Sequence, residues 1–211
     1  ANPVGKYEAL SAYLNNTQAE IILTADIDFG ADALSEENTV SPIESFTGSF
    51  NGNSYTISNL RIDAVKGEAG LFATVGGDAE NVAQFTDITF DNVYITGRGE
   101  AGALAGVAGE FTEIRNVSVK NSGSAGYVVG AVSGAIVGSM AGGTMTDAYA
   151  DVSVDGDYSA GGLVGVMNAG AIRTSSSLAD VTVSGMAASE NEDAVYGVGG
   201  LVGIARGEIE Q

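Results

Sequence analysis

The sequence contains no cysteine, no histidine and no tryptophan, and only two prolines occur among its 211 residues. The missing cysteine and histidine exclude a disulfide framework, a thiolate nucleophile, a zinc site built from these residues and the usual proton carrier at neutral pH. The missing tryptophan removes the aromatic side chain that most commonly stacks against sugar rings. Composition alone therefore excludes several kinds of catalytic and metal-binding site and makes one common kind of sugar contact impossible.

Basic residues are scarce as well. Eight lysines and arginines stand against 27 acidic residues, which gives a formal net charge of −19 at pH 7. A surface of this sign repels the phosphates of nucleic acids and of anionic membranes, so we expect neither as a partner. The same charge suits a soluble secreted protein, a saline habitat or a need for divalent cations, and composition does not separate these three.

Glycine, by contrast, is abundant, with 31 residues, and much of it falls in a repeated motif. The copies are GLFAT from Gly70, GALAG from Gly102, GAIVG from Gly134, GGLVG from Gly161 and GGLVG from Gly199. The offsets between them are 32, 32, 27 and 38 residues. Recurrence at such intervals is typical of a chain built from similar units that bury their apolar faces by stacking.

Each motif is followed by a polar turn and a short segment rich in valine, isoleucine and threonine. The segments Ala150–Gly156 and Ala179–Gly185 are nearly identical, ADVSVDG and ADVTVSG, with apolar residues at alternate positions. This alternation indicates strands with one buried face. We therefore predict an all-β fold, a parallel β-solenoid of five to six rungs, in which glycine permits the sharp turn and the close approach of neighbouring rungs.

The chain is expected to form a single domain. Tyr7, Leu10, Tyr13 and Leu14 lie three or four residues apart and predict a short amphipathic helix that caps the N-terminal end. The next stretch alternates as a strand, and Asn51-Gly52 predicts a tight turn between two short extended runs. The expected divisions are residues 1–17 for the helix, 18–68 for the opening strands and first rung, and 69–211 for the glycine-motif repeats.

This organisation resembles the GLUG-motif proteins, a family of bacterial extracellular proteins named for a Gly-Leu-X-Gly core. The resemblance lies in GGLVG at Gly161–Gly165 and Gly199–Gly203, and in AEIILTADIDF followed by FTGSFNGNSYTISNLRI. Asn51 stands where the family usually has Asp, and Ser54 where it has a second Gly. The resemblance covers residues 18–211 and implies a right-handed parallel β-helix, secreted or anchored at a bacterial cell surface. It implies no catalytic residue.

One segment matches the opening of a calcium-binding loop. Asp151, Ser153, Asp155 and Asp157, with Gly156, reproduce the pattern D-x-S-x-D-G, in which oxygens on alternate residues wrap a hard cation. The twelfth position of the loop is Gly162 where such loops carry a bidentate Glu. The alternative is an ordinary strand and turn with solvated acids. The acidic run Ser189–Asp193 is expected to be a solvated loop.

Two further patterns favour other interpretations. Residues 121–146 carry no charge and have a glycine at every fourth position from Gly126 to Gly142, which on a helix would form the close-packing face of a membrane span. Against this, each glycine costs roughly 1 kcal/mol in a helix interior, and GAIVG fits the solenoid repeat. The run Gly197–Gly203 approximates a dinucleotide loop but lacks the strand-loop-helix context that such a loop requires.

The sequence thus predicts a noncatalytic extracellular or cell-surface β-helix module, acting in adhesion or as a structural spacer, with a protein or glycan partner. No cofactor is expected, apart from calcium at Asp151–Asp157. The alternative function is a filament subunit that self-associates through the solenoid ends, because an open last rung offers unpaired backbone groups. A polysaccharide-active enzyme is a remote alternative, since a glycosidase needs only two well-placed carboxylates.

Overall fold

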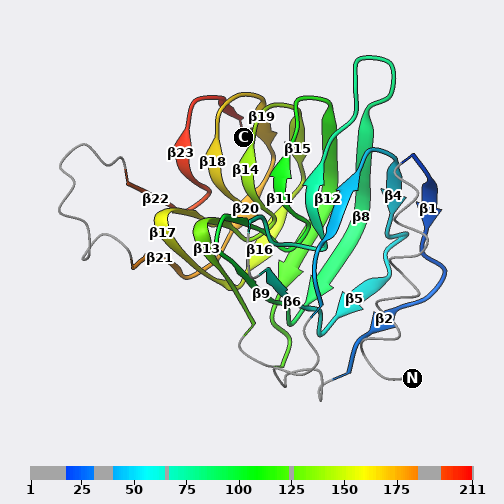
Figure 1. Cartoon of the computed structure of the whole chain (residues 1–211), viewed down its shortest axis with the longest axis horizontal. Helices are drawn as coiled ribbons and strands as arrows, with labels where there is room; N and C mark the ends of the chain where they lie inside the picture. The colour runs from blue at the N-terminus through cyan, green and yellow to red at the C-terminus, as the bar shows by residue number, and fades with distance from the viewer. Residues whose placement is uncertain (1–17, 31–39, 65–66, 124–125, 185–195, 211) are drawn as a thin grey trace.

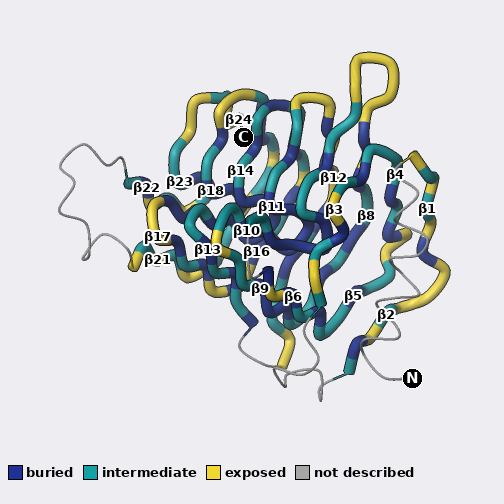
Figure 2. The backbone as a smooth tube through the Cα atoms, in the orientation of Figure 1, coloured by how far each residue is buried: buried dark blue, intermediate teal, exposed yellow. Residues whose placement is uncertain are grey.

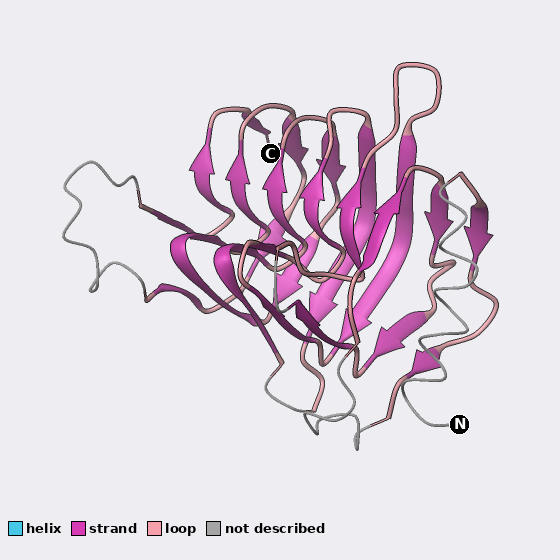
Figure 3. Cartoon of the chain, viewed as in Figure 1, coloured by secondary structure: helices cyan, strands magenta, loops and turns pink. Residues whose placement is uncertain are grey.

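A computed structural model describes residues 18–30, 40–64, 67–123, 126–184 and 196–210. Within these ranges the regular structure consists of β-strands alone, from β1 (Glu20–Ile22) to β24 (Glu208–Glu210), and contains no helix (Figures 1 and 3). The strands pair in parallel throughout (Figure 1). This arrangement confirms the parallel β-solenoid that the repeats predict.

The chain winds repeatedly through three sheets, which we call sheets A, B and C, with eleven, seven and six strands. Sheet A contains β1, β2 (Ile27–Asp28), β4 (Ser49–Asn51), β5 (Thr56–Ser58), β8 (Ala83–Asp91), β12 (Thr112–Lys120), β15 (Thr144–Thr146), β16 (Tyr149–Asp151), β19 (Ala171–Arg173), β20 (Ser176–Ser177) and β24. Sheet B contains β6 (Arg61–Ala64), β9 (Tyr94–Gly97), β10 (Glu100–Ala101), β13 (Tyr127–Gly134), β17 (Ser153–Gly161), β21 (Val181–Val183) and β22 (Gly197–Gly199). Sheet C contains β3 (Ile43–Phe46), β7 (Phe72–Val75), β11 (Ala105–Ala108), β14 (Val137–Met140), β18 (Val164–Met167) and β23 (Val202–Ala205).

Sheet C gives the number of turns because each turn contributes one strand to it. Its six strands follow one another in chain order from β3 to β23, so five complete turns lie between the first and the last. Residues that pair between neighbouring strands form columns that run along the solenoid. The outward columns determine the surface of the molecule, and the inward columns form its core.

The core is a stack of such inward columns (Figure 2). One column in sheet A is apolar in every turn, and its members are Ile21, Phe50, Phe85, Ile114, Met145, Ile172 and Ile209. In the first turns the core is aromatic: the rings of Phe46, Phe72 and Phe85 lie 5.1 to 5.9 Å apart. In sheet C one column runs from Ile43 and Phe72 to alanine and then valine, so its side chains become smaller after Phe72 toward the C-terminal end.

The glycine motif forms the corner between sheets B and C. In the copy at Gly161–Gly165, Leu163 and Val164 are fully buried, and the first glycine ends β17. A β-carbon on Gly161 would overlap the carbonyl oxygen of Val164, and one on Gly165 would lie against the backbone of the preceding turn. The motif is therefore a steric requirement of the corner, as the sequence predicts.

The first copy of the motif is one residue shorter than the others. Ala69 pairs with Ala101, whereas Phe72 pairs with Ala105. The corner at Gly70 therefore reaches sheet C after one residue fewer than the corner at Gly102. The pairing between neighbouring strands of sheet C nevertheless stays in register.

A bend divides sheet A lengthwise into two facets. At the bend four consecutive turns place a non-glycine residue with positive φ: Asp87, Asn116, Asp147 and Thr174, at φ of 55°, 52°, 54° and 46°. The side-chain amide of Asn116 donates to Oδ1 of Asp87 at 2.7 Å, and the hydroxyl of Thr174 donates to Oδ1 of Asp147 at 2.5 Å. We call these four residues the bend column. Asn and Asp tolerate the left-handed region better than other non-glycine residues.

Three expectations from the sequence can be compared with these elements. The capping helix within residues 1–17 lies outside the described residues. The uncharged span 121–146 forms the extended strands β13, β14 and β15 and not a helix. Asn51-Gly52 begins the turn between β4 and β5, and Ser54 in this turn has a φ of 65°. Among the described residues no helix is long and apolar enough to span a membrane.

Candidate ligand-binding groove

The outer face of sheet A carries two polar columns on the facet that precedes the bend column in each turn. Both columns cross the five strands β8, β12, β15, β19 and β24. The first consists of Gln84, Glu113, Thr144, Ala171 and Glu208. The second consists of Thr86, Arg115, Thr146, Arg173 and Glu210. The intervening residues, Ile114 among them, point into the core, so the strand alternation places these polar groups outward.

Two adjoining hollows lie over these columns. The first, of about 290 Å³, is lined by Gln84, Thr86, Glu113, Ile114, Arg115, Thr144 and Thr146. The second, of about 490 Å³, is lined by Gly143, Thr144, Ala169, Gly170, Ala171, Arg173, Arg206, Gly207 and Glu208. Because both hollows include Thr144, they adjoin each other along the solenoid, and we call the two together the sheet A groove. Five strands at about 4.8 Å spacing make it ~19 Å long.

The floor of the second hollow is low because glycines form the turn that leads into sheet A. Gly143 and Gly170 have φ of +79° and +91°, a conformation that favours glycine. A β-carbon on Gly170 would overlap the carbonyl oxygen of Gly143 in the turn below. The stacking of the turns therefore keeps this site free of side chains, and a ligand can approach the backbone there.

Arginine is concentrated in the groove. Three of the five arginines in the sequence, Arg115, Arg173 and Arg206, line it. Nε of Arg173 binds Oε2 of Glu210 at 2.8 Å, and its Nη2 lies 4.0 Å from Oε2 of Glu208. Nη1 of Arg206 donates to the side-chain oxygen of Asn168 at 2.8 Å.

Arg115 has a different environment from these two. It is exposed and pairs in the ladder with Thr86 on one side and Thr146 on the other. Among the described residues no carboxylate lies within 4.0 Å of its guanidinium. Lys120 on the same strand, in contrast, stands between Asp91 and Asp151 in its column. Within its own column, Arg115 therefore has a threonine and not a carboxylate on either side.

These groups determine what the groove can do chemically. The amide of Gln84, the hydroxyls of Thr86, Thr144 and Thr146 and the guanidinium groups are hydrogen-bond donors that face outward. Their partners would be hydroxyl, carbonyl or anionic oxygens of a ligand that lies along the columns. The geometry suits an extended polymer better than a compact molecule, because the groove is long, shallow and open.

The four residues of the calcium motif lie elsewhere in sheets A and B. Asp151 ends β16, while Ser153, Asp155 and Asp157 belong to β17. Val152 and Val154 between them are 3% and 1% exposed, so the segment is an extended strand and not a wrapped loop. Oδ1 and Oδ2 of Asp155 accept hydrogen bonds from Thr182 and Ser184 at 2.9 and 3.0 Å.

Across the described ranges, no group of three or more acidic residues is placed to hold a metal ion. The calcium site therefore stays a prediction of the sequence, without support from this geometry. The acidic run Ser189–Asp193 lies outside the described residues.

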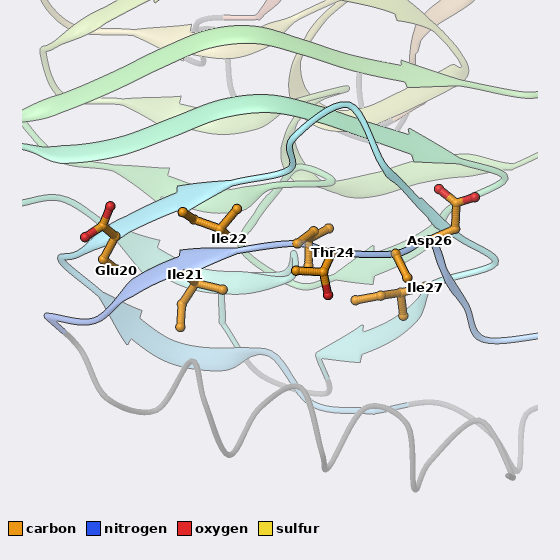
Figure 4. A pocket seen from close by; sticks show the side chains of 8 residues that line it. Glu20, Ile21, Ile22, Thr24, Asp26 and Ile27 are labelled. Carbon is orange, nitrogen blue, oxygen red and sulfur yellow. The ribbon is translucent and has the colours of Figure 1, made fainter.

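Another hollow lies at the N-terminal end of the solenoid (Figure 4). It is lined by residues Glu20 to Ile27 of β1, β2 and the turn between them, and its apolar members are Ile21, Ile22, Leu23, Ala25 and Ile27. At the opposite end Ile209 is 46% exposed, although its column partner Ile172 is 1% exposed. Within the described residues, both ends of the core column in sheet A are thus only partly covered.

Sequence reasoning did not find the groove, although a signal for it exists. Arg115 and Arg173 are far apart in the sequence, and only the pairing of β12 with β15 and of β15 with β19 brings them into one column. Alignment of TEIRN, GTMTD and GAIRT by their turns would place Arg115, Thr146 and Arg173 at one position. The glycine motif lies on another corner and does not reveal this alignment.

No family model matches the chain, and no solved structure matches it. The chain is similar to halomucin of Haloquadratum walsbyi, with 34% identity over 119 residues. That similarity covers 51% of this chain and 1% of halomucin. The chain therefore corresponds to a very small part of a much longer protein, and the similarity does not assign it to a family.

Proposed function

We propose that this chain is a noncatalytic extracellular module, a right-handed β-solenoid that presents the sheet A groove to a partner at a cell surface. Right-handed winding is usual for crossovers between parallel strands. The observation that carries the proposal is the groove itself, because hydrogen-bond donors from five consecutive turns line two adjoining hollows. A rigid groove of this kind suits adhesion, and the solenoid that carries it also acts as a spacer.

The similarity to halomucin supports an extracellular location. The formal charge of −19 agrees with a protein that remains soluble in a saline medium, where salt screens repulsion between carboxylates. The GLUG-motif resemblance leads independently to a secreted or surface-anchored protein.

A glycan-array measurement with the purified chain tests this function. We expect retention of at least one glycan, with no change in the chain length of the bound glycan after prolonged incubation. Thr146→Tyr places a bulky side chain in the groove, and it should abolish retention. The matched control is Thr182→Tyr in β21 of sheet B, outside the groove. Reproducible cleavage of a glycan would contradict a noncatalytic module.

A filament subunit is the second candidate, and the columns of the first and last described turns favour it. The first described turn carries Ile21 and Ile43 at the same columns where the last described turn carries Ile209 and Val202. Stacking of these two turns from two copies would therefore continue two apolar columns and pair their strands. Glu20 and Glu208 would meet in such a stack and repel each other, so assembly should require high salt.

Light scattering between 0.1 and 2 M NaCl tests assembly. We expect growth in mass with salt, and Ile209→Lys should prevent it. A strict monomer across the whole range of salt and protein concentration would exclude the filament.

A further inference from the structure

Six cationic side chains belong to the described residues, and half of them line the sheet A groove. Three glutamates, Glu113, Glu208 and Glu210, lie in the same two columns, so the charges of the groove balance locally, whereas the protein as a whole carries a net charge of −19. The arginines also differ from one another in whether the protein provides a carboxylate partner for the guanidinium. Arg173 has carboxylate partners, whereas Arg115 has none within 4.0 Å among the described residues.

We propose that the sheet A groove binds an extended acidic glycan, with Arg115 as the primary anchor for its carboxylate or sulfate groups and Arg173 as the second. This inference rests on the proposed function and names the class of ligand. An exposed guanidinium offers five N–H donors in a planar fork that matches the oxygens of carboxylate and sulfate. The threonines on either side of Arg115 leave these donors accessible and supply hydroxyls to the sugar rings.

The spacing of the two arginines sets the periodicity of the ligand. Arg115 and Arg173 occupy the same column with Thr146 between them, so they are two strand spacings, or ~10 Å, apart. This distance is about the length of a disaccharide in an extended chain. A glycan with one acidic group in each disaccharide would therefore present an anion at both arginines, and the intervening sugar would lie over Thr146.

The neighbouring carboxylates limit how the ligand binds. Glu210 occupies Nε of Arg173, which leaves its other guanidinium nitrogens to contact the ligand. Glu113 lies on the same strand as Arg115 and is held toward Gln84, whose Nε2 is 3.5 Å from its Oε2. We expect Arg115 to contribute more to binding than Arg173, because among the described residues no carboxylate lies within 4.0 Å of its guanidinium.

Calorimetric titration of the full chain in 0.5 M NaCl tests the inference. The probes are a hyaluronan hexasaccharide, with one carboxylate per disaccharide, a κ-carrageenan hexasaccharide, with one sulfate per disaccharide, and the neutral chitin hexasaccharide. We expect one or both acidic probes to bind at least ~10-fold more tightly than the neutral one, which corresponds to a difference of one charge-assisted contact. The stronger acidic probe identifies which anion the groove prefers.

Arg115→Gln should weaken binding of the acidic probe ~10-fold or more, and Arg173→Gln should weaken it less. Arg98→Gln, which removes an exposed arginine outside the groove, is the matched control and should change the affinity less than twofold. Circular dichroism and the melting temperature confirm that each variant is folded.

Equal binding of all three probes, with no effect of Arg115→Gln, would overturn the acidic ligand but leave a glycan-binding module intact. Binding of none of the probes would also overturn the acidic ligand. Cleavage of a probe would instead contradict the noncatalytic function, so failure of the ligand proposal can be distinguished from failure of the proposed function.

Discussion

The side-chain amide of Asn116 donates a hydrogen bond at 2.7 Å to Oδ1 of Asp87, the residue directly below it in the solenoid. Both residues have positive φ. The contact places a neutral donor between Asp87 and Asp147, the two carboxylates of the bend column. Hydrogen bonding along the column therefore compensates for like charges that would otherwise stack one above another.

Asn116→Asp should test this compensation. The variant would stack three carboxylates at successive turns and lose the donor to Asp87, so we expect the free energy of unfolding to fall by about 1–2 kcal/mol at low salt. Urea denaturation in 0.1 and 1 M NaCl measures the change, and the higher salt should recover part of it. Asn116→Gly keeps the left-handed conformation without added charge and serves as the control. An equal loss in both variants at both salt concentrations would contradict the electrostatic explanation.

The glycine motif provides a matched pair within one repeat position. A β-carbon on Gly162 would overlap the carbonyl oxygen of Gly200, whereas one on Gly200 would meet nothing within 4 Å. We expect Gly162→Ala to destabilise the protein by about 3 kcal/mol and Gly200→Ala to change stability by less than ~1 kcal/mol, because only the first forces the turns apart. Thermal denaturation of both variants gives the comparison. Similar melting temperatures would mean that the corner is not limited by contact between turns.

The aromatic part of the core should be the most sensitive to truncation. Phe85 is fully buried, and its ring lies 5.7 Å from that of Phe72. Phe85→Ala should lower the free energy of unfolding by about 3–5 kcal/mol. Phe111, which is 39% exposed, is the control, and its replacement by alanine should cost about 1 kcal/mol or less. Chemical denaturation distinguishes the two values readily.

Salt should stabilise the whole protein. The net charge is −19, and among the described residues ion pairs occur only at Arg173. Raising NaCl from 0.1 to 1 M shortens the screening length from about 10 to about 3 Å, which weakens the repulsion between surface carboxylates. We expect the melting temperature to increase by several degrees over this range. A flat or falling melting temperature would show that surface repulsion does not limit stability.

Asp78 lies in the loop between β7 and β8, which projects from the solenoid (Figure 1). Backbone N–H groups of Glu80 and Asn81 donate to its Oδ1 at 2.9 and 2.8 Å and lower its pKa below the ordinary value of 3.8. Because the folded pKa is depressed, this contribution to stability is present above pH 3.8 and is lost as the pH falls through the folded pKa. The carboxyl carbon signal of Asp78 should therefore titrate below that of other exposed aspartates in NMR spectra. A midpoint at or above theirs would contradict the turn geometry.

The sequence predicts the scaffold because glycine spacing and strand alternation are local signals of stacking. Val164 and Leu163 could be placed in the core from their position in GGLVG alone. The groove could not be predicted in this way, since its columns depend on the register between turns whose lengths range from 27 to 38 residues. The calcium pattern at Asp151–Asp157 depends on residue types along one segment. These types match a loop, whereas burial of Val152 and Val154 stabilises a strand there.

The two residues 157–158 in the middle of β17 correspond, one turn later, to the whole stretch 184–196, since Gly156 pairs with Val183 and Ser159 with Gly197. The columns on both sides of this point continue in register despite the added length. The solenoid thus accommodates a longer connection between Val183 and Gly197 while the pairing on both sides is kept. Foreign peptides of moderate length could be displayed there, and a repeat protein of this type could diversify its loops while the core and the groove stay unchanged.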